Sequence, residues 1–379
     1  MKKEKKNKIS DIILILIFCG ILLFFFLSFI FIKPKMYSDT EKRKLAEFPK
    51  VSLSTILSGE FMVGFEEYIN DHIVFKDEMV SLGNYLKLVT GQKELNGVVI
   101  GKDDYLFNKF ECNEENERNI DKSIEFLNLF KYKDNTVFML VPTSEGVIEN
   151  KFPRWYTPFN QKCLIDNIYN RVDLNCVDVY SLLKENRLYI ENIYYKTDPH
   201  WTMQGSYYGY LALCEKLGIE PLDYSELSYS VLKNGYKGST YSKINMLNSE
   251  DILYKLELVK NLPVQIQINE EENIFNDLYF TKYLDSIDNY SVYLGGNNGI
   301  VRVKSNVDNG KKLLIIKDSF SHTLVPYLIN HYSEIVLIDF RYYALSVNKL
   351  IREEKFDDIA IIYNIENFKN DKRLIFLTR

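Results

Sequence analysis

The chain is poor in the residues that mark several specialised protein classes. Among its 379 residues are nine Pro, 17 Gly and only four His, and no Cys-x-x-Cys pair or His/Cys cluster occurs. It contains no internal repeats and no low-complexity tracts, whereas its hydrophobic content of 46% is ordinary for a globular protein. We therefore expect a globular chain with no metal site and no cofactor.

Cysteine is also scarce. One of the five cysteines, Cys19, lies in an apolar run, and the others are Cys112, Cys163, Cys176 and Cys214. An oxidising compartment would permit disulfides, and four cysteines allow three connectivities. Their spacing matches no known framework, so the sequence leaves the pairing open.

A net positive charge is confined to the first residues. Residues 1–11 carry five Lys against Glu4 and Asp11, which is +3, and the apolar run that follows carries none. Because the whole chain has a net charge of −5, residues 33–379 carry −8. An acidic domain of this kind is a poor candidate for nucleic-acid binding, and we expect no nucleic-acid partner.

One long hydrophobic segment is present. Ile12 to Ile32 is an uncharged run of 21 residues, which is the length that one membrane-spanning helix needs. The larger Lys cluster precedes it, which predicts a cytoplasmic N-terminus. A cleaved signal peptide is the alternative, but the run is longer than a usual h-region and no small-x-small site follows. We expect a single-pass cell-membrane protein with a basic cytoplasmic tail (1–11), a transmembrane signal anchor (12–32), a membrane-proximal helical region (33–95) and an extracytoplasmic domain (96–379).

The last 70 residues show the clearest fold pattern. Apolar runs of strand length alternate with helical patterns; the runs are Leu313–Ile316, Ile335–Ile338 and Ile359–Ile362, and the helices are Thr323–Ile329 and Val347–Glu354. This alternation predicts an α/β fold, a parallel sheet with helices on both faces. Upstream, we expect a strand over 136–141, a helix from Thr202 to Leu217 ended by Gly218, and a strand-turn-strand over 290–301. Residues 225–290 are the hardest to assign.

Three polar residues follow these last strands directly. Ser319, Arg341 and Asn364 each come just after one strand. Because ligands of parallel sheets bind at the carboxyl ends of the strands, these residues are candidates for one site. For Ser319, a helix N-cap is the ordinary alternative.

The segment Asp198-Pro199-His200 supplies the partners that a nucleophilic serine needs. A serine needs a base, and the base needs a third group that fixes its tautomer. Pro199 favours an extended Asp198, and residues two apart in an extended segment project to the same side. His200 is thus a candidate base and Asp198 its orienting carboxylate. His322, three residues after Ser319, is a competing base without an obvious carboxylate.

A second, weaker pattern is Gly295-Gly296-Asn297. Glycines let backbone N–H groups approach a ligand, and an Asn side chain can donate to a developing oxyanion. Gly296 and Asn297 are therefore candidates for oxyanion or substrate binding. A β-turn is the alternative, and it is the better interpretation for Asn298-Gly299.

Several motifs, in order, resemble those of the DHHW family, which is related to the SGNH-hydrolase-like domains of the alginate O-acetyltransferase group. The resemblance lies in the segments 41–49, 101–107, Asp198-Pro199-His200-Trp201 with Gly205-Ser206-Tyr207, Gly238-Ser239-Thr240-Tyr241, 293–297, Lys317-Asp318-Ser319-Phe320 and Asp339-Phe340-Arg341-Tyr342. Pro199 stands where the family name has a second His. That position varies among the acetyltransferase relatives, so the departure leaves the roles of Asp198 and His200 intact.

The resemblance implies both fold and chemistry. It implies an SGNH-like domain with Ser319 as nucleophile, His200 as base, Asp198 as orienting residue and Arg341 in the pocket. Such relatives transfer acetyl groups to hydroxyls of extracellular polysaccharides, often with a multi-spanning membrane O-acyltransferase that supplies the acyl group. We accordingly expect O-acyl transfer to a cell-envelope or exported polysaccharide. A carbohydrate esterase of the same fold, a non-catalytic glycan-binding or scaffold subunit, and D-alanylation-type transfer onto wall polymers are the alternatives.

Overall fold

The structure is a computed structural model that describes residues 2–379 except 32, 39, 189–191, 246–248 and 259–261. Residue 32, the last of the predicted anchor, thus lies outside the described residues. The chain forms two compact units, one of residues 1–92 with 244–246 and the other of residues 93–243 with 247–379. Each is described by itself.

The first unit is mainly helical. Helix α1 (Lys2–Phe31) contains one stretch, Asp11–Phe29, that is long and apolar enough to cross a membrane by length and composition. A short pairing of β1 (Tyr37–Ser38) with β2 (Arg43–Lys44) precedes α2 (Leu53–Ser58), α3 (Glu60–His72) and α4 (Lys76–Val89). In α3, the rings of Phe61, Phe65 and Tyr68 lie on one face, and Phe48 packs edge-on against all three. These contacts follow from the helical spacing of the three aromatic residues.

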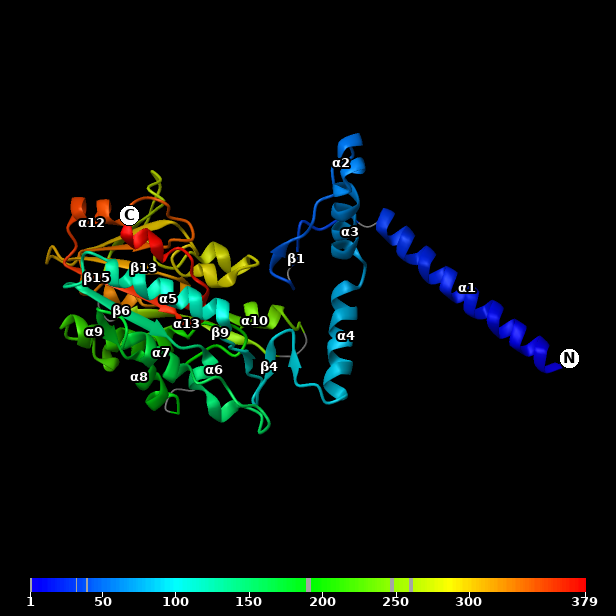
Figure 1. Cartoon of the computed structure of the whole chain (residues 1–379), viewed down its shortest axis with the longest axis horizontal. Helices are drawn as coiled ribbons and strands as arrows, with labels where there is room; N and C mark the ends of the chain where they lie inside the picture. The colour runs from blue at the N-terminus through cyan, green and yellow to red at the C-terminus, as the bar shows by residue number, and fades with distance from the viewer. Residues whose placement is uncertain (1, 32, 39, 189–191, 246–248, 259–261) are drawn as a thin grey trace. The chain divides into compact units, whose positions relative to one another are not determined.

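An eight-stranded sheet is the centre of the second unit (Figure 1). Its order is β11 (Ile274–Phe275), β10 (Val264–Ile268), β12 (Ile300–Ser305), β14 (Glu334–Ile338), β13 (Lys312–Lys317), β15 (Asp358–Asn364), β6 (Thr136–Val141) and β7 (Asn175–Val177). The five strands from β14 to β7 are parallel, as the alternating pattern predicts. Strands β12, β10 and β11 extend the sheet in antiparallel fashion, which the prediction of a parallel sheet missed.

Helices cover both faces of this sheet, as predicted. Successive residues of β13 point to opposite faces: Leu313 and Ile315 join one buried cluster, and Leu314 and Ile316 the other. The first cluster includes residues of α8 (Val179–Asn186), α9 (Met203–Leu217) and α11 (Val325–Leu328). The second includes residues of α5 (Glu114–Leu129), α7 (Gln161–Tyr169), α12 (Val347–Glu354) and α13 (Ile365–Asn370). The α/β fold class is thereby confirmed.

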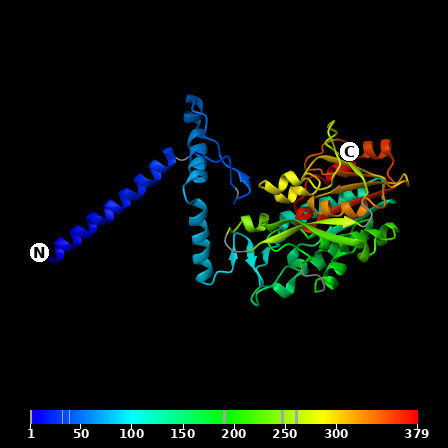
Figure 2. The same cartoon turned by 180° about the vertical axis from the view of Figure 1, so that it is seen from behind.

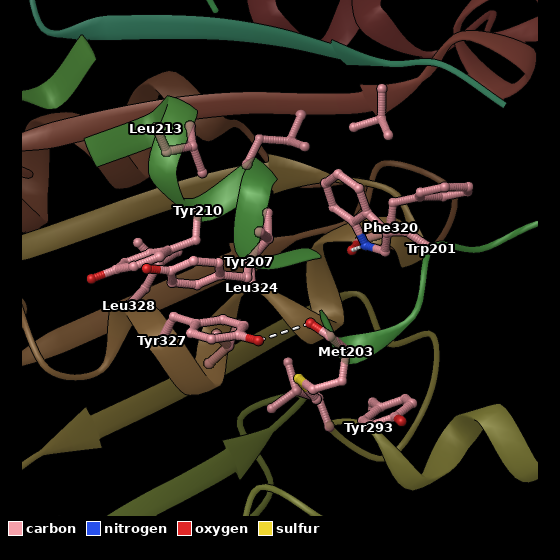
Figure 3. Packing of buried hydrophobic residues seen from close by; sticks show 14 of the residues in the cluster. Trp201, Met203, Tyr207, Tyr210, Leu213, Tyr293, Phe320, Leu324, Tyr327 and Leu328 are labelled. Atoms are coloured by element: carbon pink, nitrogen blue, oxygen red, sulfur yellow. Dashed lines mark hydrogen bonds between the residues drawn. The ribbon is translucent and has the colours of Figure 1, made fainter. Parts of the chain in front are cut away.

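Helix α9 begins and ends where the sequence predicts. The Thr202 side chain caps it by accepting from the Gly205 N–H, and Gly218 ends it in the left-handed conformation at φ +65°. Its buried face packs Tyr207 and Tyr210 against Tyr327 of α11 (Figure 3). The Tyr327 hydroxyl also donates to the Met203 carbonyl at 2.8 Å, so the first turn of α9 is fixed to α11.

Two regions differ from, or add to, the expectation. The segment 290–301 begins as a 3₁₀ helix (Asn289–Val292) and not as a strand. Leu294, Gly295 and Gly296 then all take positive φ and turn the chain before β12, which begins at Ile300. Residues left unassigned form the antiparallel pair β8 (Leu227–Tyr236) and β9 (Asp251–Leu258). This pair packs on the same face of the large sheet as α9, which is the face nearer the viewer in Figure 2.

The remaining described elements are short. Strands β3 (Glu94–Leu95), β4 (Val98–Ile100) and β5 (Leu106–Asn108) form a small antiparallel sheet, and α6 (Ser144–Val147) and α10 (Ser239–Ser242) are single turns. All five cysteines are free, so none of the three possible disulfide connectivities is present.

Candidate active site

Ser319 lies at the carboxyl end of β13, where the strand passes into a 3₁₀ turn (Ser319–Thr323). Asp318 fixes this turn: its Oδ1 accepts the Phe320 N–H at 2.9 Å, and its Oδ2 accepts the Asn364 N–H at 2.7 Å. Asn367 Nδ2 donates to the same Oδ2 at 2.7 Å. The residue before the serine thus joins the ends of β13 and β15, and Ser319 is held at the edge of the sheet.

His200 reaches Ser319 from a segment 119 residues earlier. Its Nε2 lies 2.7 Å from Ser319 Oγ, and its Nδ1 lies 2.5 Å from Asp198 Oδ1. Since a carboxylate only accepts, the network assigns the ring proton to Nδ1 and leaves Nε2 to accept from the serine hydroxyl. The three residues chosen from the sequence therefore form one hydrogen-bonded chain with the order of roles of a Ser-His-Asp site.

Asp198 is buried and held as a carboxylate. Its Oδ2 accepts from the Tyr236 hydroxyl at 2.9 Å and from the Ser239 N–H at 3.0 Å. Burial alone raises its pKa, but the charge and hydrogen bonds of His200, together with the backbone donors, outweigh this effect and hold the pKa of Asp198 below its usual value. Gly238 lies against this carboxylate so closely that a Cβ there would overlap Asp198.

Aromatic residues fix the His200 ring and its segment. Tyr290 stacks on the imidazole with ring centroids 3.9 Å apart and planes at 14°, and Phe320 lies 4.6 Å from it. The indole of Trp201 lies beside Phe320 (Figure 3), and its N–H donates to the Phe320 carbonyl at 3.0 Å. The same N–H donates to Thr323 Oγ1 at 2.9 Å. The histidine segment and the serine turn are thus joined by the Trp201 bonds as well as by the bond between His200 and Ser319.

His322, the competing base, has a different partner. Its Nε2 lies 2.7 Å from Nζ of Lys317, and burial together with that charge holds the pKa of His322 well below its ordinary value. Lys317 is itself buried, which lowers its pKa to about 8, although Asp339 at 3.5 Å favours the charged form. His322 is therefore a neutral ring bonded to a lysine, and the histidine that contacts Ser319 is His200.

Arg341 and Asn297, two further predicted site residues, touch each other. Arg341 Nη2 donates to Asn297 Oδ1 at 3.1 Å. The same guanidinium binds Asp339 with two bonds, Nε to Oδ1 at 2.9 Å and Nη2 to Oδ2 at 2.6 Å, which raise the pKa of Arg341 despite its burial. Since Asp339 also contacts Lys317, Arg341 is linked to the strand that carries Ser319.

The other two predicted residues have structural contacts. Asn364 caps α13, and its Nδ2 donates to the Val141 and Pro142 carbonyls at 3.0 and 3.3 Å. Gly296 has φ +83°, and a Cβ there would come within 2.5 Å of Ser291 Oγ. Among the described residues, neither Asn364 nor Gly296 forms a hydrogen bond with Ser319. Their part in substrate binding stays a prediction. Within the described residues, no group of three or more His, Cys, Asp or Glu side chains is arranged to hold a metal.

Sequence reasoning missed several residues that support the site. Tyr236 and Ser239 bond Asp198, and Asp251 accepts from the Lys196 and Thr197 backbone at 2.9 and 2.8 Å. Tyr290 is the fourth, stacked on His200. The Gly238-Ser239 motif was a usable signal. Tyr236 and Asp251 lie in a region that has no clear pattern, and Tyr290 lies in a segment that was expected to be a strand.

Comparison with known proteins gives a family and a fold. The family model described as "DHHW protein" matches residues 90–338. A search of curated proteins found no similar sequence. The chain is similar to the crystal structure of a DHHW family protein from Eubacterium siraeum, with 22% identity, a TM-score of 0.65, and coverage of 75% of this chain and 95% of that one.

Two other solved structures are more distant. PatB1 from Bacillus cereus, described with a sulfonyl adduct, is 18% identical with a TM-score of 0.58 over 74% of this chain and 98% of that one. The O-acetyltransferase domain of Pseudomonas putida AlgJ is 13% identical with a TM-score of 0.47 over 73% of this chain and 93% of that one. The similarity to the Eubacterium siraeum protein and to PatB1 shows the fold.

Proposed function

This chain belongs to the DHHW family, and we propose that it is a membrane-anchored, extracytoplasmic O-acyltransferase that acetylates a cell-envelope or exported polysaccharide through an acyl-serine. The observation that carries the proposal is the hydrogen-bonded chain Asp198–His200–Ser319. The His200 side chain is 13% exposed and that of Asp198 only 4%, so a substrate can reach the base while its orienting carboxylate is shielded from water.

The geometry supports a two-step reaction. Ser319 Oγ attacks the carbonyl carbon of an acyl donor as its proton passes to His200 Nε2, and the leaving group takes that proton as the acyl–donor bond breaks. A sugar hydroxyl then attacks the acyl-serine and gives its proton to His200. Collapse of the second tetrahedral intermediate returns the proton to Ser319 and releases the O-acyl sugar. No metal or cofactor is required for either step.

The N-terminal helix supports the proposed location. Its apolar stretch and the Lys cluster before it suit a signal anchor with a cytoplasmic N-terminus. An acyl donor made inside the cell would then have to cross the membrane, for which a multi-spanning O-acyltransferase is the expected partner.

The acceptor distinguishes a transferase from an esterase, because a transferase passes the acetyl group to a sugar and an esterase passes it to water. Full-length protein in detergent micelles would be given an activated acetyl ester with and without neutral oligosaccharides, and acetylated sugar and free acetate would be measured. We expect acetyl-sugar to form, and both Ser319→Ala and Asp198→Asn to lower the rate by about 10³-fold or more. Free acetate alone would support an esterase, and no turnover with a folded protein would support the scaffold alternative.

A further inference from the structure

An open hollow lies beside Arg341, at the edge of the sheet that carries Ser319. Its volume is about 350 Å³. It is lined by two turns that meet there, chiefly by Asn269, Glu270, Asn297, Asn298, Tyr342 and Leu345. The steps of the proposed reaction use none of these residues, although Asn297 is a predicted oxyanion or substrate-binding candidate, and no described residue fills the space.

The floor of the hollow is a rigid set of amides. Asn269 Oδ1 accepts the N–H groups of Gly299 and Ile300 at 3.0 and 3.3 Å, and Asn298 Nδ2 donates to the Gly295 and Gly296 carbonyls at 3.3 Å each. These bonds hold the turn before β12 in one conformation. A ligand would therefore meet a preformed surface and would spend little free energy on ordering it.

The groups that remain free fit a sugar. Asn297 is exposed and its Oδ1 is held by Arg341, so its Nδ2, which bonds to nothing among the described residues, can donate to a hydroxyl. Tyr342 is 59% exposed, with the Arg341 guanidinium 5.6 Å from the centroid of its ring, and the exposed part of the ring offers an apolar platform with a polar tip. Glu270 adds an acceptor for hydroxyl protons. An apolar platform with a few fixed polar groups is the usual design of a small-molecule site.

The charges around the hollow favour an uncharged ligand. Arg341 makes two bonds to Asp339, which Lys317 also approaches at 3.5 Å, and Arg302 makes two bonds to Glu354. The carboxylate of Glu270 lies 3.6 Å from Arg302, and no other cation pairs with it among the described residues. Both guanidinium groups already bind carboxylates of the chain, and the exposed Glu270 would repel a ligand carboxylate or phosphate.

The position of the hollow relates it to Ser319. In the sheet, Ile338 of β14 pairs with Ile316 of β13 on one side and with Ile300 of β12 on the other. The hollow follows β14 and precedes β12, whereas Ser319 follows β13. Because neighbouring strands lie about 4.8 Å apart, the hollow is roughly one or two strand spacings from the strand that carries the serine. A short oligosaccharide can span that distance.

We infer that this hollow binds an uncharged sugar unit of the acceptor polysaccharide, adjacent to the unit whose hydroxyl is acylated at Ser319. The position relative to the reaction rests on the proposed function, but binding in the hollow does not. The hollow selects the acceptor as a neutral glycan and excludes polyanionic polymers such as uronic-acid chains.

Binding is tested without catalysis. Full-length Ser319→Ala protein in detergent micelles would be titrated by calorimetry with N-acetylglucosamine tetramer, glucose tetramer and, as the charged probe, galacturonate tetramer. We expect at least one neutral tetramer to bind, and Tyr342→Ala in the same background to weaken it about tenfold through loss of the ring. Tyr342→Phe should retain the affinity within about threefold.

A second exposed tyrosine serves as the control for Tyr342→Ala. Tyr224, which is 52% exposed and lies far along the chain on a short 3₁₀ helix, would be changed to Ala in the same background and should leave the affinity unchanged. Equal affinity in Tyr342→Ala and its parent, tighter binding of the charged tetramer, or no binding of either neutral tetramer would overturn the inference. If the Ser319→Ala protein binds a neutral tetramer but the wild type transfers no acetyl group, sugar binding in the hollow is supported and the proposed function is rejected.

Discussion

The indole N–H of Trp201 donates to the backbone carbonyl of Phe320 at 3.0 Å, across 119 residues of sequence. Trp201 directly follows His200, and Phe320 directly follows Ser319, so this bond joins the two segments one residue away from the reacting groups. We infer that this bond helps to set the distance between His200 Nε2 and Ser319 Oγ.

We therefore expect Trp201→Phe to impair catalysis more than stability. Phe fills most of the buried space but cannot donate to Phe320 or Thr323, and a displacement of the histidine segment by about 1 Å can cost about 10²-fold in rate. The measurement is the rate of acyl-enzyme formation with an activated ester. Trp155→Phe is the matched control, because Trp155 is 50% exposed, and it should leave the rate unchanged. Equal rates in the two variants would show that the indole bond does not position the site.

Gly238 is predicted to be essential because of the space it leaves. A Cβ at this position would overlap the Cβ and Oδ2 of Asp198, so Gly238→Ala must displace the carboxylate from His200. We expect the rate of acyl-enzyme formation to fall by about 10²-fold or more. Gly83→Ala, in helix α4 with no atom within 4 Å of the added Cβ, should leave the rate unchanged. Full activity in Gly238→Ala would contradict the tight packing of the site.

Lys317 gives a prediction of stability against pH. Burial lowers its pKa from 10.5 to about 8 in the folded state, despite the attraction of Asp339. Between about pH 8 and 10.5 the unfolded chain binds more protons at this lysine than the folded chain, so the Lys317 contribution to stability rises with pH in that window. From pH 7.5 to 9.5 the gain is about 2 kcal/mol, relative to a variant without the amine.

Lys317→Met supplies the comparison. Asp339 keeps its two bonds to Arg341 in this variant, so no carboxylate is left alone. Thermal unfolding of both proteins in detergent is measured at pH 7.5 and 9.5. The Tm of the wild type minus that of the variant should be several degrees larger at pH 9.5 than at pH 7.5. A difference in Tm that is the same at both pH values would mean that Lys317 keeps an ordinary pKa.

Much of the sheet is predictable from the sequence because its strands are buried on both faces. Short apolar runs such as Leu313–Ile316, alternating with helical patterns, favour buried strands, and Thr202 and Gly218 mark the ends of α9 through their own local chemistry. The antiparallel strands β10, β11 and β12 carry no such signal. They are short or alternate with polar residues, and their pairing depends on strands far along the chain.

The candidate site also has residues that the sequence predicts and residues that it does not. Asp198, His200 and Ser319 could be selected because their chemistry is recognisable from residue type and spacing. The environment that holds them could not: Tyr290 lies in a segment that has the composition of a strand, yet it forms a 3₁₀ turn that brings its ring onto His200. Tyr236 reaches Asp198 from the end of β8, a strand that sequence reasoning did not assign. Such contacts depend on tertiary packing and not on local pattern.

The central claim is that Ser319 forms a covalent acyl-enzyme with the help of His200. The direct measurement is the intact mass of the full-length protein after brief exposure to an activated acetyl ester and, separately, to a sulfonyl fluoride, the class of reagent that leaves a sulfonyl group on a reactive hydroxyl. We predict one adduct per chain with each reagent, located on Ser319 by peptide mapping, absent from Ser319→Ala and strongly reduced in His200→Ala. A folded wild-type protein that gains no adduct, or one that gains it equally in Ser319→Ala, would contradict the account.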